Sequence, residues 1–99
     1  MFVMVSRFNV RPGEEDAFVA LHEAAGAGSQ PGIEGLISRE LLTDMNHPST
    51  FITLARYRDR EAAEAHSHDL EDGDWHQRLV SLSRETPDTA LFRTAWKAE

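Results

Sequence analysis

The sequence contains no cysteine, a single lysine and no long apolar run. Without cysteine there is no disulfide, no thiolate metal ligand and no cysteine nucleophile. The first residues, Met1 to Phe8, lack the basic flank and long apolar core of a signal peptide. No segment approaches the roughly 20 apolar residues that cross a membrane. We therefore expect a cytoplasmic protein that has no membrane partner.

Positive charge is also scarce. The chain carries 17 acidic against 10 basic residues and has a net charge of −7. Many of the carboxylates lie between Asp59 and Asp74, and such a surface repels nucleic acid. The sequence has no Gly-x-Gly-x-x-Gly, no phosphate loop and no Gly-x-Ser-x-Gly, so nucleotide and esterase chemistry have no support. An uncharged or weakly charged small ligand is compatible with this composition.

The patterning predicts one domain over residues 1–99, without repeats or linkers. Apolar alternation predicts strands, helical spacing of apolar residues predicts helices, and Asp59 is the expected N-cap of one helix. Glycine and proline around Pro31-Gly32, and Asp72-Gly73, are expected to interrupt the helical regions. The expected elements are a strand over 2–10, a helix over 14–25, strands over 36–43 and 50–58, a helix from residue 59 to about 66 or 68, a helix over 75–83 and a strand over 89–96.

This order predicts a ferredoxin-like α+β fold, in which a four-stranded antiparallel sheet carries its helices on one face. The opposite face would be left open. Val3 and Val5 share one face of the first strand, and the third strand is apolar on both faces. An open apolar face of this size favours a homodimer in which two sheets pack against each other.

Several short motifs, in this order and spacing, resemble the antibiotic biosynthesis monooxygenase family. They are Val10-Arg11-Pro12-Gly13-Glu14-Glu15, Pro31-Gly32, Gly35-Leu36, Leu41-Leu42-Thr43-Asp44, Asn46-His47-Pro48, the segment from Arg56 to His66, and Trp75-His76-Gln77. The resemblance implies a dimeric α+β barrel with a pocket between the helices and sheet of each protomer. The fold hosts several activities, including haem-degrading ones. Two positions depart from the family pattern: Tyr57 stands where tryptophan is usual, and Ser6 where the haem-degrading branch carries asparagine.

Tyr57 and His66 are the candidate catalytic residues. They lie nine positions apart, at the end of a strand and in the following helix, and could meet in one cavity. The phenol could donate a hydrogen bond while the imidazole, with an ordinary pKa near 6.5, acts as a general base. The alternative is packing, in which Tyr57 lies under the helix and His66 complements the helix dipole.

Ser6 and Trp75 are the candidate substrate-pocket residues. Ser6 interrupts the apolar face of the first strand, so its hydroxyl could mark a ligand cavity or bond a neighbouring carbonyl. Trp75 begins an apolar stripe with Leu79 and Leu82, at helical spacing, and is expected to pack in the core or at a dimer edge, or else to cover the pocket. His22 is expected at the boundary of the first helix.

Histidines and carboxylates between Glu64 and His76 raise the question of a metal site. His66 and His68 are two residues apart and point about 200° away from each other on a helix. Glu64 with His68, or His68 with Asp72, has better spacing for a shared metal ion, but each pair supplies too few ligands for a closed site. A solvated acidic face is the expected interpretation, and we predict no metal.

The resemblance thus implies a cofactor-independent monooxygenase that uses dioxygen and a small aromatic, quinol or polyketide-like substrate. In such chemistry, as the resemblance implies it, removal of a proton makes an electron-rich anion that reduces dioxygen itself. Two alternatives stay open: a haem-binding or haem-degrading protein with His66 as axial ligand, and a non-catalytic small-ligand-binding dimer.

Overall fold

The computed structural model describes residues 1–26, 35–71 and 74–98. The expected loop at Pro31-Gly32 lies outside these residues, as do Asp72 and Gly73 of the expected interruption at Asp72-Gly73-Asp74. The sheet has the strand order β2-β3-β1-β4 with every pair antiparallel, as a ferredoxin-like fold requires. The elements are β1 (Phe2–Asn9), α1 (Glu15–Gly26), β2 (Leu36–Thr43), β3 (Thr50–Tyr57), α2 (Arg60–Glu71), α3 (Asp74–Ser81) and β4 (Asp88–Arg93).

The predicted order of elements is confirmed, and two boundaries were wrong by several residues. The last strand ends at Arg93 and not at Trp96, because Arg93 pairs with Phe2 and β1 begins there, so later residues have no strand to pair with. The helix α2 extends to Glu71, beyond His68, because no helix-stopping residue occurs before Asp72-Gly73. Asp59 is confirmed as its N-cap, since its carboxylate accepts a hydrogen bond from the Ala62 amide at 2.8 Å.

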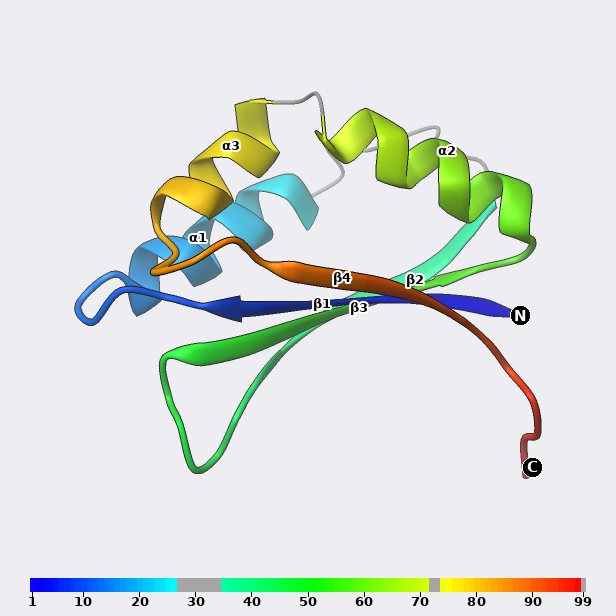
Figure 1. The fold of residues 1–99 in the computed structure, drawn as a ribbon, viewed down its shortest axis with the longest axis horizontal. Helices are drawn as coiled ribbons and strands as arrows, with labels where there is room; N and C mark the ends of the chain where they lie inside the picture. The colour runs from blue at the N-terminus through cyan, green and yellow to red at the C-terminus, as the bar shows by residue number, and fades with distance from the viewer. Residues whose placement is uncertain (27–34, 72–73, 99) are drawn as a thin grey trace.

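All three helices lie on one face of the sheet (Figure 1), α1 and α3 over one end and α2 over the other. The buried core is correspondingly divided into two clusters. The first, between the sheet, α1 and α3, contains Phe8, Val10, Phe18, Phe51 and Leu79. The second, under α2, contains Met4, Ala55, Tyr57 and Ala63. The space between the two clusters is where a ligand could fit.

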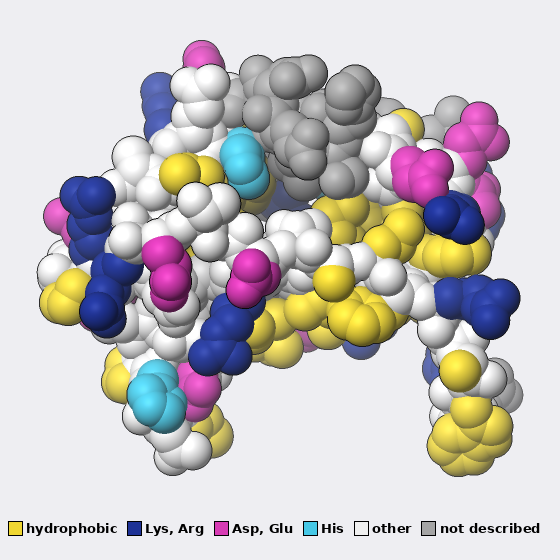
Figure 2. Space-filling model, viewed as in Figure 1, with side chains coloured by type: hydrophobic (Ala, Val, Ile, Leu, Met, Phe, Trp, Pro, Cys, Tyr) yellow, Lys and Arg dark blue, Asp and Glu magenta, His cyan; other side chains and the backbone are white. Residues whose placement is uncertain are grey.

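None of the described helices lies on the other face of the sheet (Figure 1). Strand register puts apolar side chains there, and two of them, Leu42 and Phe92, are 42% and 54% exposed. The larger apolar residues that the register places on this face include Val3, Val5, Leu42, Ile52, Leu54 and Phe92. Figure 2 shows hydrophobic side chains along the sheet between two projections, which are the β2–β3 turn and the C-terminal segment.

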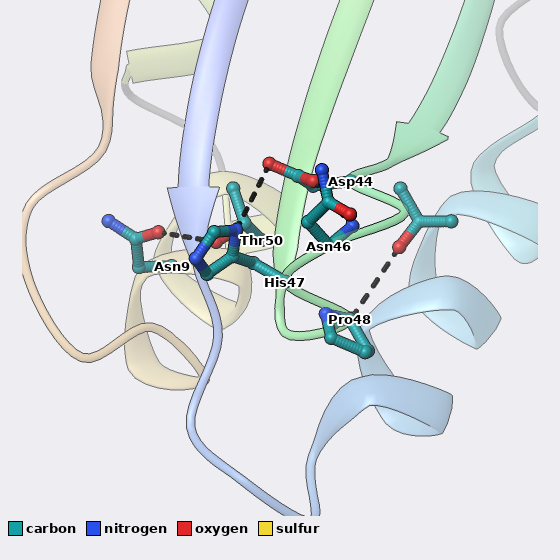
Figure 3. Close-up of polar contacts among 7 residues, drawn as sticks. Asn9, Asp44, Asn46, His47, Pro48 and Thr50 are labelled. Carbon is teal, nitrogen blue, oxygen red and sulfur yellow. Dashed lines mark hydrogen bonds and ion pairs between the residues drawn. The ribbon is translucent and has the colours of Figure 1, made fainter.

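The β2–β3 turn is held by its own polar side chains (Figure 3). Asp44 accepts a hydrogen bond from the Asn46 amide at 2.8 Å, and its other oxygen lies 3.6 Å from Nδ1 of His47. The pKa of Asp44 is lowered mainly by the hydrogen bond from the Asn46 backbone amide, and the nearby His47 also lowers it. Thr50 donates to the side chain of Asn9 at 2.9 Å, which ties the turn to the end of β1.

Within the described parts of the chain, no helix has the length and apolar character needed to span a bilayer.

Candidate active site

A cavity of about 250 Å³ lies between the helices and the sheet, where the two core clusters meet. This volume is slightly below the range of about 300–1,000 Å³ typical of ligand sites, so the cavity suits a compact ligand. All four residues predicted for the site contact it. The described residues that line it are Met4, Ser6, Phe8, Arg39, Thr53, Ala55, Tyr57, His66, Trp75, His76, Leu79, Thr86, Pro87 and Thr89.

Tyr57 and His66 are brought together, as the sequence predicts. Tyr57 is the last residue of β3 and is fully buried, while His66 lies on the inner side of α2 and is 5% exposed. The Tyr57 hydroxyl and Nδ1 of His66 form a hydrogen bond, and their rings meet edge to face with centroids 5.5 Å apart. Burial raises the pKa of Tyr57 to about 12, and nearby Arg39 partly opposes that rise. The phenol is therefore protonated at neutral pH.

The hydrogen bond to Tyr57 limits which ring nitrogen of His66 could bind another group. Its Nδ1 contacts Tyr57, and its Nε2 is buried. An axial haem ligand needs a ring nitrogen that faces the bound group. Nδ1 of His66 is bonded to Tyr57 in this conformation, so a haem iron could take that nitrogen only if the pair separated.

Ser6 belongs to a row of three hydroxyl-bearing residues that crosses the sheet beneath the cavity. Strand register pairs Ser6 with Thr53 of β3 on one side and with Thr89 of β4 on the other. The Ser6 and Thr89 hydroxyl oxygens are 2.9 Å apart and share a hydrogen bond. The row lies between the two apolar clusters, which leaves polar groups on the cavity floor where a ligand oxygen could bind.

Trp75 forms part of the cavity wall and is fixed to α1. Its indole N–H donates a hydrogen bond to the carbonyl of Leu21 at 3.0 Å, and its ring contacts the edge of the His22 ring at 5.1 Å between centroids. His22 in turn donates from Nδ1 to the carbonyl of Phe18 at 2.9 Å. A tryptophan held on both sides gives the cavity a rigid aromatic surface.

Arg39 is one of the cavity residues that sequence reasoning missed. A β-bulge between Leu36 and Ser38 shifts the alternation of β2, so that Leu36 and Arg39 both pair with helix-facing residues of β3. Simple alternation from Leu36 would put Arg39 on the opposite face. Its guanidinium carbon lies 5.3 Å from the centroid of the Trp75 ring, within the range of a cation–π contact.

The described side chains contain no group of three or more His, Asp or Glu residues placed to hold a metal ion. Among the predicted candidates, His66 and His76 both line the cavity, and the side chain of His68 lies outside the described ones. Arg56 lies on the open face, as its strand position allows, and donates to Glu40 at 3.1 Å.

The strand order defines a small ferredoxin-like α+β protein with a cavity between its helices and sheet. The family model described as antibiotic biosynthesis monooxygenase matches residues 1–78. The chain belongs to this family. A comparison with curated proteins finds no match.

Two solved structures illustrate the proteins that share this fold. The Rv0793 protein from Mycobacterium tuberculosis is 19% identical, with a TM-score of 0.80 over 99% of this chain and 98% of that chain. SnoaB from Streptomyces nogalater, a cofactor-independent oxygenase, is 21% identical, with a TM-score of 0.78 over 97% of this chain and 94% of that chain. At these identities the likeness establishes the fold.

Proposed function

We propose that the protein is a homodimeric, cofactor-independent monooxygenase that acts on a small aromatic, quinol or polyketide-like compound. Family membership and the fold shared with SnoaB support this class of activity. The observation that carries the proposal is the buried hydrogen bond between Tyr57 and His66 at the wall of the cavity. Hydrogen-bonded acid–base pairs in cavities are frequent sites of proton transfer.

In the proposed reaction, Tyr57 relays a proton from substrate to His66. An acidic substrate hydroxyl or enol donates to the Tyr57 oxygen, and the Tyr57 proton moves to Nδ1 of His66. The relay suits the geometry because Tyr57 already contacts that nitrogen and Nε2 is buried. The substrate becomes an electron-rich anion, and His66 becomes the imidazolium.

The anion then supplies the electrons that reduce dioxygen. For a substrate with a reactive CH₂ group, one dioxygen converts CH₂ into C=O and releases one water, so one oxygen atom enters each product. The proton held by His66 returns to the departing oxygen. The protein orients the substrate and surrounds it with preorganised groups. The Ser6 and Thr89 hydroxyls supply the polar part of that surface and the Trp75 ring the aromatic part.

The homodimer in the proposal uses the open face of the sheet. The apolar strip on that face, with Leu42 and Phe92 both more than a third exposed, would be covered by the same strip of a second copy. This arrangement leaves the cavity free, because the cavity lies on the helix side of the sheet.

Oxygen uptake tests the activity. An oxygen electrode would follow consumption with anthrone and with 1,4-naphthohydroquinone, and ¹⁸O₂ would show one labelled atom in the product. We expect Tyr57→Phe and His66→Gln each to lower kcat by about a hundredfold or more. His47→Gln, in the exposed β2–β3 turn, is the matched histidine control and should retain full activity.

Two results would count against the proposal. One is uptake that survives both Tyr57→Phe and His66→Gln, which would remove the pair from the chemistry. The other is a ligand-dependent rise in melting temperature without any oxygen uptake, which would favour a small-ligand-binding protein instead.

A further inference from the structure

The cavity has hydrogen-bonding groups at two separated places. At one of them, Tyr57 and His66 form the hydrogen-bonded pair of the proposed relay. At the other, the row of hydroxyl-bearing residues that contains Ser6 crosses three strands. Met4 and Ala55, which are both buried, pair with each other between these two places. A ligand in the cavity would therefore cover an apolar middle and meet polar groups at both ends.

Thr53 is the residue of the hydroxyl row that shares a strand with Tyr57. Both belong to β3 and line the cavity. They are four residues apart, so their side chains face the same side of the sheet, with Cα atoms about 13 Å apart. Ala55 stands between them on that side, and its small side chain leaves room for a flat ring. Thr53 thus marks the end of the cavity remote from the relay.

The three hydroxyls of the row differ in their hydrogen bonds. Ser6 and Thr89 share one bond, with their oxygens 2.9 Å apart. The Thr53 hydroxyl, on the other side of Ser6, makes no hydrogen bond with any of the described residues. A threonine hydroxyl carries one proton and two lone pairs. Thr53 therefore has a proton available for a ligand.

The partial burial of Thr53 makes this proton selective. A ligand that fills the cavity takes the place of water at the hydroxyl, and the lost hydrogen bond is recovered only if the ligand has an acceptor atom there. A carbon group at that position leaves the hydroxyl unpaired. Sites built in this way reject analogues that lack the matching polar atom. Since Thr53 is half-buried, such an analogue is disfavoured.

Thr86 also lines the cavity and bears a hydroxyl, but its surroundings differ. It precedes β4, which begins at Asp88, and its side chain is exposed. An exposed hydroxyl keeps its contact with solvent when a ligand binds, so an unmatched ligand costs little there. Thr53 is the better candidate for selection.

We propose that Thr53 is a specificity-determining residue that donates a hydrogen bond to a carbonyl oxygen at the end of the ligand remote from the relay. This inference rests on the proposed function, in which the other end of the ligand presents an acidic hydroxyl to Tyr57. When that hydroxyl loses its proton, conjugation carries part of the negative charge to the remote oxygen, and the bond from Thr53 becomes charge-assisted. The ligand class is narrowed to aromatic compounds that carry a hydroxyl and a conjugated carbonyl at opposite ends.

Calorimetry with two matched ligands tests the proposal without turnover. The ligands are 6-hydroxy-1-tetralone and 5,6,7,8-tetrahydro-2-naphthol, which share one skeleton and differ in a carbonyl that the second replaces with CH₂. Binding is measured under nitrogen at about pH 6, where both phenols are un-ionised. We expect the wild-type protein to bind the ketone about tenfold more tightly than the parent phenol.

Variants of Thr53 assign that preference. Thr53→Val removes the hydroxyl with little change in shape or strand propensity, and should bring the two affinities to within about twofold. Thr53→Ser retains a hydroxyl and should keep most of the preference. Thr43→Val, at an exposed position of β2 outside the lining of this cavity, is the matched control and should keep the full preference. Melting curves confirm that each variant is folded, and the wild-type comparison stands even if Thr53→Val is not.

Equal affinity of the wild-type protein for the ketone and the parent phenol would overturn the proposal, as would a preference that survives in folded Thr53→Val. The proposed function fails on a different measurement. A ketone preference that depends on Thr53, without oxygen uptake on any substrate, keeps Thr53 as the selector and removes the monooxygenase. Oxygen uptake without a ketone preference does the reverse.

Discussion

The hydroxyl of Tyr57 and Nδ1 of His66 form a hydrogen bond that joins the end of β3 to the inner side of α2. Tyr57 is fully buried in the cluster under α2, together with Met4, Ala55 and Ala63. The bond satisfies a buried hydroxyl that would otherwise lack a partner in that apolar setting. It therefore serves the packing of α2 as well as any chemistry, and the two roles predict different measurements.

The structural role predicts a coupled loss of stability. Tyr57→Phe removes the hydroxyl and leaves a buried imidazole nitrogen without that partner, so we expect the free energy of unfolding to fall by about 1–3 kcal/mol. Urea unfolding of Tyr57→Phe, His66→Leu and the double variant forms a double-mutant cycle. The double variant should lose less than the sum of the single losses. Additive losses would contradict a direct interaction between the two side chains.

The ionisation of Tyr57 can be observed directly because it is the only tyrosine in the chain. Its pKa is raised to about 12 by burial, against about 10 in an unfolded chain. At pH 11 the phenolate absorbance in the near ultraviolet should correspond to about 10% ionisation in the folded protein and about 90% in guanidinium. Circular dichroism at the same pH verifies the folded state. Equal ionisation in both conditions would show that the phenol is not buried.

Two glycines with positive φ differ in their surroundings and form a matched pair. Gly13 has φ +91° and no atom near an added Cβ, whereas Gly35 has φ +84° and would place a Cβ 2.5 Å from that of Ala62. Gly13→Ala should cost about 1–2 kcal/mol through backbone conformation alone. Gly35→Ala should cost at least about 1 kcal/mol more, because α2 must shift.

A second substitution, in α2, tests whether the close contact causes the extra loss of stability at Gly35. Combining Gly35→Ala with Ala62→Gly removes the close contact, so the double variant should be more stable than the sum of the single losses predicts. Equal losses for the two glycine variants in thermal or urea unfolding would mean that α2 does not approach Gly35 this closely.

The sequence was sufficient for the fold because its signals are local and agree with one another. Alternation defined β1 and β3, Asp59 marked the start of α2, and the order of elements left few arrangements of the sheet. The end of β4 could not be obtained in the same way. Residues after Arg93 continue to alternate, but the ladder with β1 ends at the pair of Phe2 and Arg93, followed by a single hydrogen bond from the Thr94 amide to the Met1 carbonyl.

Part of the candidate site could be predicted from the sequence, because that part also depends on local signals. Tyr57 and His66 are close in sequence, so the strand, turn and helix between them could bring them together. Arg39 was not found, since its side depends on a bulge that alternation does not reveal. The partnership of Ser6 with Thr53 and Thr89 was also hidden, because strand register depends on pairings between residues far apart in the chain.

His22 should make stability depend on pH. Burial lowers its pKa from 6.5, with Arg39 contributing to the decrease. Its Nδ1 is bonded to the Phe18 carbonyl, and its buried Nε2 has no hydrogen-bond partner among the described residues. The unfolded chain therefore binds a proton that the folded protein resists, and stability falls as pH decreases below about 6.5.

Chemical unfolding at several pH values measures this effect. His22→Gln should show a shallower loss of stability than the wild-type protein between about pH 7.5 and pH 5. At about pH 8 both side chains are neutral, so the difference there reports only the packing cost of the substitution. Parallel pH profiles for the two proteins would contradict a lowered pKa for His22.

The proposed dimer predicts that a charge disrupts it at one of two neighbouring residues of β4 and not at the other. Phe92 pairs with Val3 on the open face and is 54% exposed, whereas Leu91 pairs with Met4 on the helix side and is 38% exposed. Phe92→Glu would put a charge in the apolar strip of each copy, where two copies would bring like charges together. Light scattering at micromolar concentration should then report a dimer for the wild-type protein and for Leu91→Glu, and a monomer for Phe92→Glu. A wild-type protein of monomeric mass would remove the dimer from the proposal, and a Phe92→Glu protein that remains dimeric would move the interface to another surface.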